Sequence, residues 1–183
     1  IQNWYYDGSS QDVRQIGMFV NLDLDYQGRY IASALVRRDG ASLFGAANRW
    51  QTYGRASFAW RASEEAWFNV DQISDLKFRA SVGQAGNRPS FAAQYETFNI
   101  GAGGVLTPNQ LGNRDLRPEV STETEIGVDV EIMSKYALTL TNSRNVINDQ
   151  ILPVPPPASA GFNTQWRNAG QLTNNTFEVS LNL

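Results

Sequence analysis

Polar and apolar residues alternate with a period of two along much of this chain. The clearest case ends at Ile132, where Ile126, Val128, Val130 and Ile132 oppose Glu123, Glu125, Asp129 and Glu131. This period is that of a β-strand, whose successive side chains point to opposite faces. Burying both faces would place four carboxylates in a dry interior at a high cost in free energy. One face of this strand must therefore be wet.

The same period predicts about seven further strands, whereas helical periodicity is hard to find. These strands are expected near Met18–Tyr26, Tyr30–Arg38, Tyr53–Ala62, Leu76–Gly83, Tyr136–Asn145, Gln165–Leu172 and Thr176–Leu183. Runs of this length and pattern are typical of antiparallel sheets with one dry and one wet face. The sequence therefore predicts an all-β fold of about eight strands.

The connections between the expected strands alternate in length. Long links are expected near residues 39–52, 84–118 and 146–164, and short ones near 27–29, 133–135 and 173–175, with 63–75 a longer link on the short side. Outer-membrane β-barrels have this asymmetry, with tight turns on one side and long loops on the other. A soluble sandwich can show the same strand pattern, so alternation alone leaves both folds open.

Composition favours the membrane interpretation and excludes several kinds of chemistry. Charged residues make up 18% of the chain, below the roughly 25% of soluble domains, and aromatic residues reach 11%. The net charge of −3 offers no basic field for nucleic acid. With no Cys and no His, thiol nucleophiles, His bases and the usual zinc ligands are absent, and we expect no metal and no cofactor.

The chain has no apolar run of the roughly 20 residues that a membrane-spanning helix needs, and its first residues do not resemble a signal peptide. If it spans a membrane, we expect it to do so with strands, as a mature or internal piece of a protein.

Several ordered motifs resemble the barrels of SusC/RagA-like TonB-dependent receptors. They lie at residues 37–45, 58–65, 75–87, 113–119, 125–129 and 168–170, and include Arg37-Arg38-Asp39-Gly40, Trp60-Arg61-Ala62-Ser63-Glu64, Asp75-Leu76-Lys77-Phe78-Arg79 and Asn113-Arg114-Asp115-Leu116. Together they cover most of the chain from about Gln15 onward. Their order and spacing make the resemblance far more specific than any single motif.

The resemblance implies an antiparallel transmembrane β-barrel, of which this chain would supply about eight of 22 strands. Residues 1–183 would form a single partial barrel domain, with the plug domain and TonB-box outside it. The whole protein would import oligosaccharides or oligopeptides across the outer membrane of a Gram-negative bacterium, and would not be an enzyme. Implied partners are a SusD-like surface lipoprotein, the TonB complex, the substrate and outer-membrane lipid.

Aromatic residues on the long loops are the candidate substrate contacts. They are Trp50, Tyr53, Tyr95, Phe98 and Trp166, about half of which we expect to pack within the loops or at the membrane interface. A second group, Tyr26, Trp60, Trp67, Phe68 and Tyr136, is expected in an aromatic girdle on the opposite, periplasmic side.

Two alternatives remain open at this point. One is a soluble all-β ligand-binding domain, either a sandwich or a small barrel of eight strands. The other, weaker one is an all-β carbohydrate-active enzyme, although Glu64-Glu65 and the pair Asp23 and Asp25 lie on a turn and a strand face that give no cleft.

Two structural expectations separate these readings. First, one set of apolar side chains should point outward into lipid, namely Val20, Leu22, Phe58, Trp60, Phe78, Val128 and Val130. Second, the fourth and fifth strands should pair with Leu76 opposite Ile132. Lys77 would then face Glu131 and Arg79 would face Asp129, with a shift of two residues as the alternative that preserves the faces.

Overall fold

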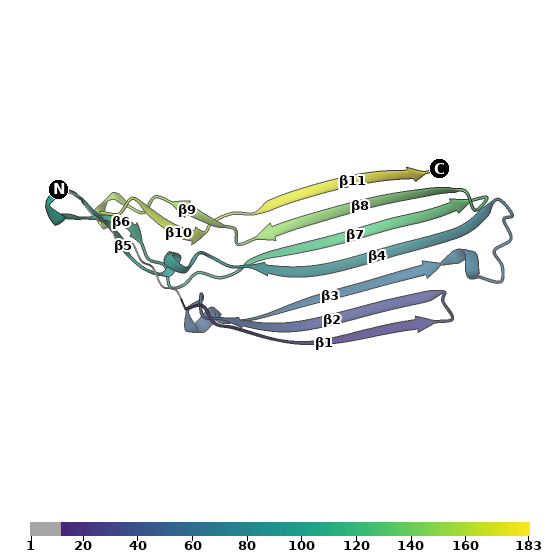
Figure 1. The fold of residues 1–183 in the computed structure, drawn as a ribbon, viewed down its shortest axis with the longest axis horizontal. Helices are drawn as coiled ribbons and strands as arrows, with labels where there is room; N and C mark the ends of the chain where they lie inside the picture. Colours follow the sequence, from purple (N-terminus) through teal and green to yellow (C-terminus); the bar gives the residue numbers. More distant parts are fainter. Residues whose placement is uncertain (1–11) are drawn as a thin grey trace, which may run out of the picture.

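The computed structural model describes residues 12–183, which form two sheets (Figure 1). The large sheet holds seven strands in the order β1 (Gln15–Tyr26), β2 (Tyr30–Ala41), β3 (Trp50–Arg61), β4 (Ile73–Asn87), β7 (Glu119–Ile132), β8 (Tyr136–Asn148) and β11 (Leu172–Asn182). Every neighbouring pair in it is antiparallel. The predicted all-β antiparallel fold is confirmed, and in the described residues the large sheet stays open rather than closing into a barrel.

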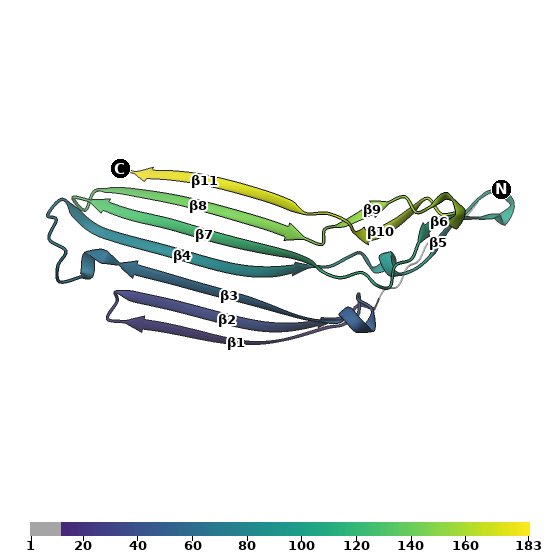
Figure 2. The ribbon, with the colours of Figure 1, turned by 180° about the vertical axis from the view of Figure 1, so that it is seen from behind.

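A small sheet of four strands extends beyond one end of the large sheet (Figures 1 and 2). Its spatial order is β5 (Thr97–Ile100), β6 (Leu106–Leu111), β10 (Thr164–Asn168) and β9 (Ile151–Val154). Five short 3-10 turns occupy the links, η1 (Ala46–Asn48), η2 (Ala62–Glu64), η3 (Phe91–Gln94), η4 (Ala102–Gly104) and η5 (Ala158–Ala160).

Of the last two expected strands, the one near Thr176–Leu183 is confirmed as β11, which begins earlier, at Leu172, whereas the one near Gln165–Leu172 is wrong in its length and its sheet. Residues from Gln165 belong to β10 in the small sheet, where Gln165 pairs with Val154. The expected turn at residues 173–175 lies inside β11, in register with β8 through the pair Thr173 and Val146. Asn174 and Asn175 have the residue type of a turn, but the ladder with β8 overrides that local preference. Within residues 12–183 the large sheet therefore contains seven long strands rather than eight.

The two ends of the large sheet differ as predicted. At the turn end, β1 joins β2 through residues 27–29 and β7 joins β8 through residues 133–135, while residues 62–72 link β3 to β4. The links of the other end, the loop end, are residues 42–49, 88–118 and 149–171, and the last two contain the small sheet. Left-handed backbone at Gln27 and Gly28 and at Met133 and Ser134 makes the short turns tight.

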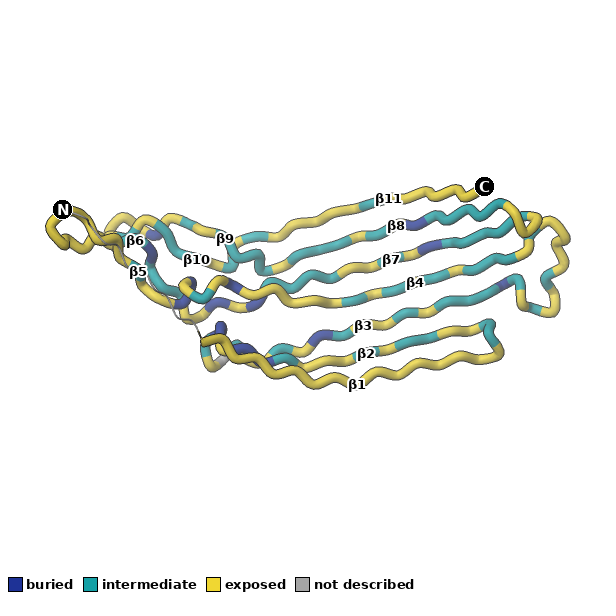
Figure 3. Tube along the Cα trace, viewed as in Figure 1, coloured by how far each residue is buried: buried dark blue, intermediate teal, exposed yellow. Residues whose placement is uncertain are grey.

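The seven strands present one face rich in apolar side chains, the apolar face, and one polar face. Apolar residues of one strand lie opposite apolar residues of the next, as in the pairs Val20 with Val36 and Phe78 with Val128, so they all project from the same side of the sheet. Large apolar side chains stay exposed, as in Val20 (75%) and Phe58 (48%), and Figure 3 shows little burial along the strands. Within residues 12–183 no second layer covers this face, so the sandwich and small-barrel alternatives are wrong.

All seven residues expected to point outward lie on the apolar face. Val20, Leu22, Phe58 and Phe78 are exposed, and Trp60, Val128 and Val130 are partly exposed between their neighbours. They share one face and do not converge on a common interior, as predicted, and contact of this face with lipid stays a prediction.

Pairing of β4 with β7 is confirmed, but its register is shifted by two residues from the expected one. Leu76 lies opposite Val130, and Lys77 lies opposite Asp129. A β-bulge between Ile73 and Asp75 adds one residue to β4 at the turn end, so the pairing differs from the expected register by three residues before the bulge and by two after it. The faces are unchanged, since an even shift preserves which side each residue occupies.

Buried apolar residues gather at the loop end. Leu116 is 1% exposed and Phe44 is 4% exposed, and the side-chain amide of Gln94 donates to the Leu43 carbonyl. Gly45 lies so close to the Arg114 carbonyl that a Cβ there would approach its oxygen to 2.4 Å. Two of the motifs that carried the family resemblance, residues 37–45 and 113–119, thus meet in this core and anchor the loops to the sheet.

Candidate functional site

The polar face carries an ion-pair cluster between β4 and β7. The Lys77 ammonium lies 2.9 Å from the Asp129 carboxylate, and the Arg79 guanidinium contacts both Glu125 and Asp129. Arg79 also donates to the Thr141 hydroxyl on β8. The predicted contact between Arg79 and Asp129 is confirmed, whereas Lys77 pairs with Asp129 rather than with the expected Glu131. The positive charges of Lys77 and Arg79 are therefore both neutralised by carboxylates of β7.

A cavity of about 310 Å³ opens on the polar face at the loop end. It lies where β3 and β4 separate, since their pairing stops at Arg55 and Gly83. Tyr53 is only 8% exposed, and its ring and hydroxyl occupy the space where a side chain at residue 86 would otherwise lie. At Gly17 the missing side chain leaves room for the Asp39 carboxylate, 2.6 Å from an added Cβ.

Arginines dominate the charge of this cavity. Its lining includes Arg37, Arg49 and Arg88 but a single carboxylate, that of Asp39. The Arg37 guanidinium pairs with Asp39 at 2.8 Å. Within residues 12–183, Arg49 and Arg88 make no ion pair.

Sequence reasoning found Tyr53 but missed the arginines around it. Arg37 is odd-numbered, and odd-numbered residues of β2 lie on the polar face, so the alternation in the sequence already predicts the side on which Arg37 lies. Arg49 precedes β3 and Arg88 follows β4, and their convergence depends on how the two strand ends separate. The sequence contains no signal for that separation.

Trp50, the second candidate near this position, points away from the cavity. It pairs with Gly40 on the apolar face, is 42% exposed, and its ring lies 5.7 Å from the Arg38 guanidinium. Its place at the loop-end margin of the apolar face is that of an interfacial aromatic.

The other three aromatic candidates lie in and beside the small sheet. Trp166 donates from its indole nitrogen to the Gln110 side chain at 2.9 Å, and the Gln110 amide donates to the Tyr95 carbonyl at 3.3 Å. Phe98 packs edge-on against Phe162 at 5.8 Å. Tyr95 (45% exposed) and Phe98 (49%) remain accessible. The five candidates therefore occupy three separate surfaces rather than one site.

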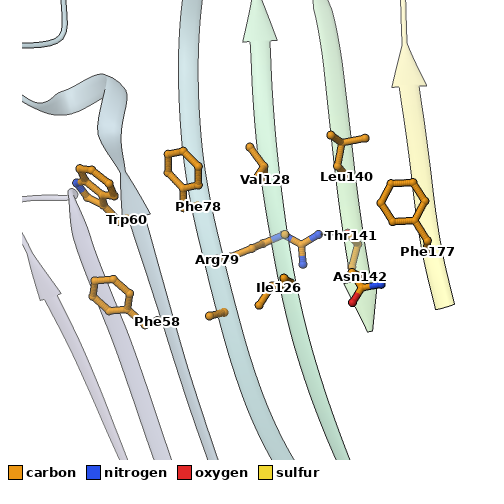
Figure 4. A pocket seen from close by; sticks show the side chains of 12 residues that line it. Phe58, Trp60, Phe78, Arg79, Ile126, Val128, Leu140, Thr141, Asn142 and Phe177 are labelled. Carbon is orange, nitrogen blue, oxygen red and sulfur yellow. Dashed lines mark hydrogen bonds between the residues drawn. The ribbon is translucent and has the colours of Figure 1, made fainter. Parts of the chain in front are cut away.

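A hollow of about 390 Å³ lies on the apolar face (Figure 4). Aromatic rings border it on both sides, with Phe58, Trp60 and Phe78 toward one edge and Phe177 toward the other, and Ile126, Val128 and Leu140 form its floor. Asn142 lies at its loop-end margin, and Thr141 is a further polar residue of the lining. Arg79 is the charged residue in its lining, and the guanidinium of Arg79 is paired with Glu125 and Asp129.

A family model described as "TonB dependent receptor-like, beta-barrel" matches residues 2–183. The chain belongs to this family. The TonB-dependent receptor P39 of Formosa agariphila is 31% identical over 172 residues, which cover 90% of this chain and 16% of that protein. SusC of Bacteroides thetaiotaomicron is 26% identical over 182 residues, covering 91% of this chain and 18% of SusC.

Solved structures share the fold. The RagAB peptide transporter superposes with a TM-score of 0.80 at 21% identity, covering 92% of this chain and 20% of that one. The siderophore receptor PirA from Pseudomonas aeruginosa gives a TM-score of 0.64 at 17% identity, with 91% and 30% covered. This TonB-dependent receptor chain thus spans less than a third of the relatives and structures named here.

Membership of a receptor family agrees with the expectation that the chain is not an enzyme. Within residues 12–183, no group of three metal-ligating side chains is positioned to hold an ion. None of the helical turns in the described part is long and apolar enough to cross a membrane.

Proposed function

We propose that this chain is part of the wall and external loops of an importer in the outer membrane of a Gram-negative bacterium. The apolar face contacts lipid, the polar face lines the lumen, and the loop end lies outside the cell. Residues 1–183 form one partial domain of a barrel of about 22 strands, and the plug and TonB-box belong to other parts of the full protein.

On the apolar face, the apolar residues of neighbouring strands form a band, and this band runs obliquely to the strand pairings. This obliquity is the observation that supports the proposal best. On β2 the apolar face ends at Arg38, whereas on β8 it ends at Asn142. Through the pairings between strands, Asn142 lies level with Ala32, six positions before Arg38. Six residues rise about 20 Å and four strand spacings cover about 19 Å, so the band crosses the strands at roughly 45°.

Strands of outer-membrane barrels tilt by about 35–45° from the membrane normal. A band of lipid contact that is level with the membrane must therefore run obliquely across the strand pairings, as this one does. A soluble sheet has no reason to keep such a slope.

The substrate in this proposal is an oligosaccharide or an oligopeptide. Tyr53 in the loop-end cavity and the accessible rings of Tyr95 and Phe98 offer stacking surfaces for either, with Trp166 beside them and Trp50 at the lipid margin. A SusD-like surface lipoprotein captures the substrate, and a TonB complex supplies energy through the plug. Similarity to SusC and to the RagAB peptide transporter supports both partners and leaves the two substrate classes open.

Single-cysteine spin labelling of the full-length receptor tests the membrane placement. The chain itself has no cysteine, so labels at Leu22→Cys and Asp23→Cys on β1 form a matched pair. We expect the first label to be relaxed by lipid-soluble oxygen and the second by a water-soluble nickel chelate. Equal accessibility of both labels to the nickel chelate would refute the lipid-facing assignment.

Gene deletion tests the transport role. A strain that lacks the full-length receptor should lose growth on some member of an oligosaccharide or oligopeptide panel as sole carbon source, with monomer growth unchanged. Unimpaired growth on every member of both panels would argue against import of these classes.

A further inference from the structure

We propose that the loop-end cavity on the polar face is a subsite for an oxyanion group, a carboxylate or a sulfate, of the imported molecule. This inference rests on the proposed import function and adds a charge requirement to it. The relevant side chains come from β2 and β3, from Arg49 between η1 and β3, and from the end of β4 and Arg88 that follows it, which the fold brings together at one end of the sheet.

Cavity size limits what can enter. At about 310 Å³ the cavity is at the small end of ligand pockets. It has room for one charged group with part of the unit that carries it, while the remainder of an oligomer would extend along the polar face. The cavity is therefore a subsite and not a complete substrate site.

Charge distribution identifies the kind of group. Three arginines and one aspartate give the lining a net charge of +2, although the whole chain carries −3. Elsewhere on the polar face, the cations of β4 are compensated by the carboxylates of β7, as Lys77 is by Asp129. The cavity keeps a local excess of positive charge that an anion would neutralise.

Within the described residues, Arg49 and Arg88 are the lining arginines without an acidic partner, while Arg37 is held by Asp39 through two contacts of 2.8 and 3.0 Å. A guanidinium presents paired N–H donors that match the oxygens of a carboxylate or sulfate. We assign anion contact to Arg49 and Arg88, and the positioning of Arg37 to Asp39.

Neutral donors surround the same space. Gln51 and Gln84 line the cavity; one N–H of each amide is already donated, to the Asn48 carbonyl at 3.2 Å and to the Thr122 hydroxyl at 3.5 Å, which leaves the second. The Tyr53 hydroxyl makes no hydrogen bond to another described residue. Tyr53 and the buried Phe44 (4% exposed) exclude water from one wall. An anion–arginine contact is stronger beside such a wall than on an open surface, because screening by solvent is weaker there.

Crystals of the full-length receptor test the proposal with anomalous scatterers. Soaks with selenate, a sulfate analogue, and with 4-bromobenzoate, a carboxylate, should place an anomalous peak between Arg49 and Arg88. A selenate peak alone assigns a sulfate subsite, and a bromobenzoate peak alone assigns a carboxylate subsite. No peak with either probe, or a receptor carboxylate already occupying the cavity, overturns the proposal.

Titration in solution separates a built site from an adventitious ion. Calorimetry should show that Arg49→Gln/Arg88→Gln raises the dissociation constant of whichever probe binds by about tenfold or more. The control is Arg144→Gln/Arg167→Gln, which removes the same charge at two exposed arginines outside the cavity and should leave affinity unchanged. Equal weakening by both double variants, or binding at crystal concentration only, overturns the subsite.

The outcome is separable from that of the proposed function. A receptor that imports substrate but binds neither probe refutes the anion subsite alone. One that binds the probe through Arg49 and Arg88 but fails to support growth on any panel member refutes the import assignment and leaves an anion site.

Discussion

Glu65 organises the turn end of the sheet from the link between β3 and β4. Its carboxylate accepts hydrogen bonds from the Tyr30 hydroxyl, from the Trp60 indole at 3.0 Å and from Arg29 at 3.3 Å. The hydrogen bond from Tyr30, with those from Trp60 and Arg29, lowers the pKa of Glu65 below its usual 4.5, although partial burial opposes them. Trp60 in turn stacks on Phe78 at 5.6 Å. The carboxylate therefore fixes an aromatic group of the predicted girdle.

Replacing Glu65 with Gln should make the receptor less stable at neutral pH and less sensitive to acid. A carboxylate with a lowered folded-state pKa adds stability above its unfolded pKa, and loses it as pH falls through the folded value. The melting temperature of the full-length receptor in detergent should drop between pH 7 and pH 3.5, and drop less in Glu65→Gln. The neighbouring Glu64→Gln, at an exposed position 3.5 Å from Arg61, should keep the wild-type response.

Gly127 leaves the space that Arg79 uses to reach its partners. A Cβ at Gly127 would lie 2.7 Å from the Arg79 guanidinium carbon. Gly127→Ala should displace Arg79 from Glu125 and Thr141 and lower stability by about 1 kcal/mol, the upper range of exposed ion pairs. At Gly83, on the polar face of β4, the nearest atom to an added Cβ is 3.5 Å away, so Gly83→Ala is the matched control. Equal thermal melting of the two variants would contradict this role.

At the scale of the strand, sequence predicts the sides of the sheet better than its register. The alternation of apolar residues predicts the face on which Leu76 and Val130 lie, because shifting the register of β4 and β7 by an odd number of residues would turn carboxylates toward the apolar face. It could not distinguish registers that differ by two residues. The bulge between Ile73 and Asp75 has no sequence signature, and the long link between β4 and β7 does not constrain their pairing as a tight turn would.

The small sheet could not be predicted because its strands break local rules. Pro108 in β6 and Pro153 in β9 argue against strands when read alone. Its central pairing is parallel, between Gln110 and Thr164, which are distant in sequence. The same long-range arrangement explains why aromatic composition identified Tyr95 and Trp166 as candidates but could not show that Gln110 links them.

Disulfide cross-linking can test the corrected course of β11. Asn174 lies directly opposite Asn145 on β8, a separation that a disulfide can bridge. In the full-length receptor, Asn174→Cys/Asn145→Cys should oxidise to a cross-linked form, seen as a mobility shift on non-reducing gels. The control Asn174→Cys/Ser143→Cys is offset by two residues on the same face, beyond the usual reach. A turn at residues 173–175 would abolish cross-linking of the first pair.

As a whole, the described chain is a single-layered sheet with very little interior. Apart from Ala62 at the turn end, its buried apolar residues lie at the loop end. The strands expose apolar side chains along one face and leave β1 and β11 as unpaired edges. In water both features are unfavourable, because exposed apolar area and open backbone edges promote association. Under the proposed function, lipid covers the face and neighbouring barrel strands complete the edges.

Residues 1–183 expressed alone should therefore associate in two distinguishable ways. In water, the apolar face and both edges should drive aggregation, measured as loss of protein from the supernatant after centrifugation. Detergent micelles cover the face but not the edges, so we expect soluble oligomers with a β-type circular dichroism spectrum, whose mass by light scattering rises with protein concentration. The full-length receptor in the same detergent is the control and should keep a constant mass, because the proposed function requires its barrel to be closed. A soluble, cooperatively unfolding monomer of residues 1–183 in water would contradict both the lipid-facing assignment and the need for neighbouring strands.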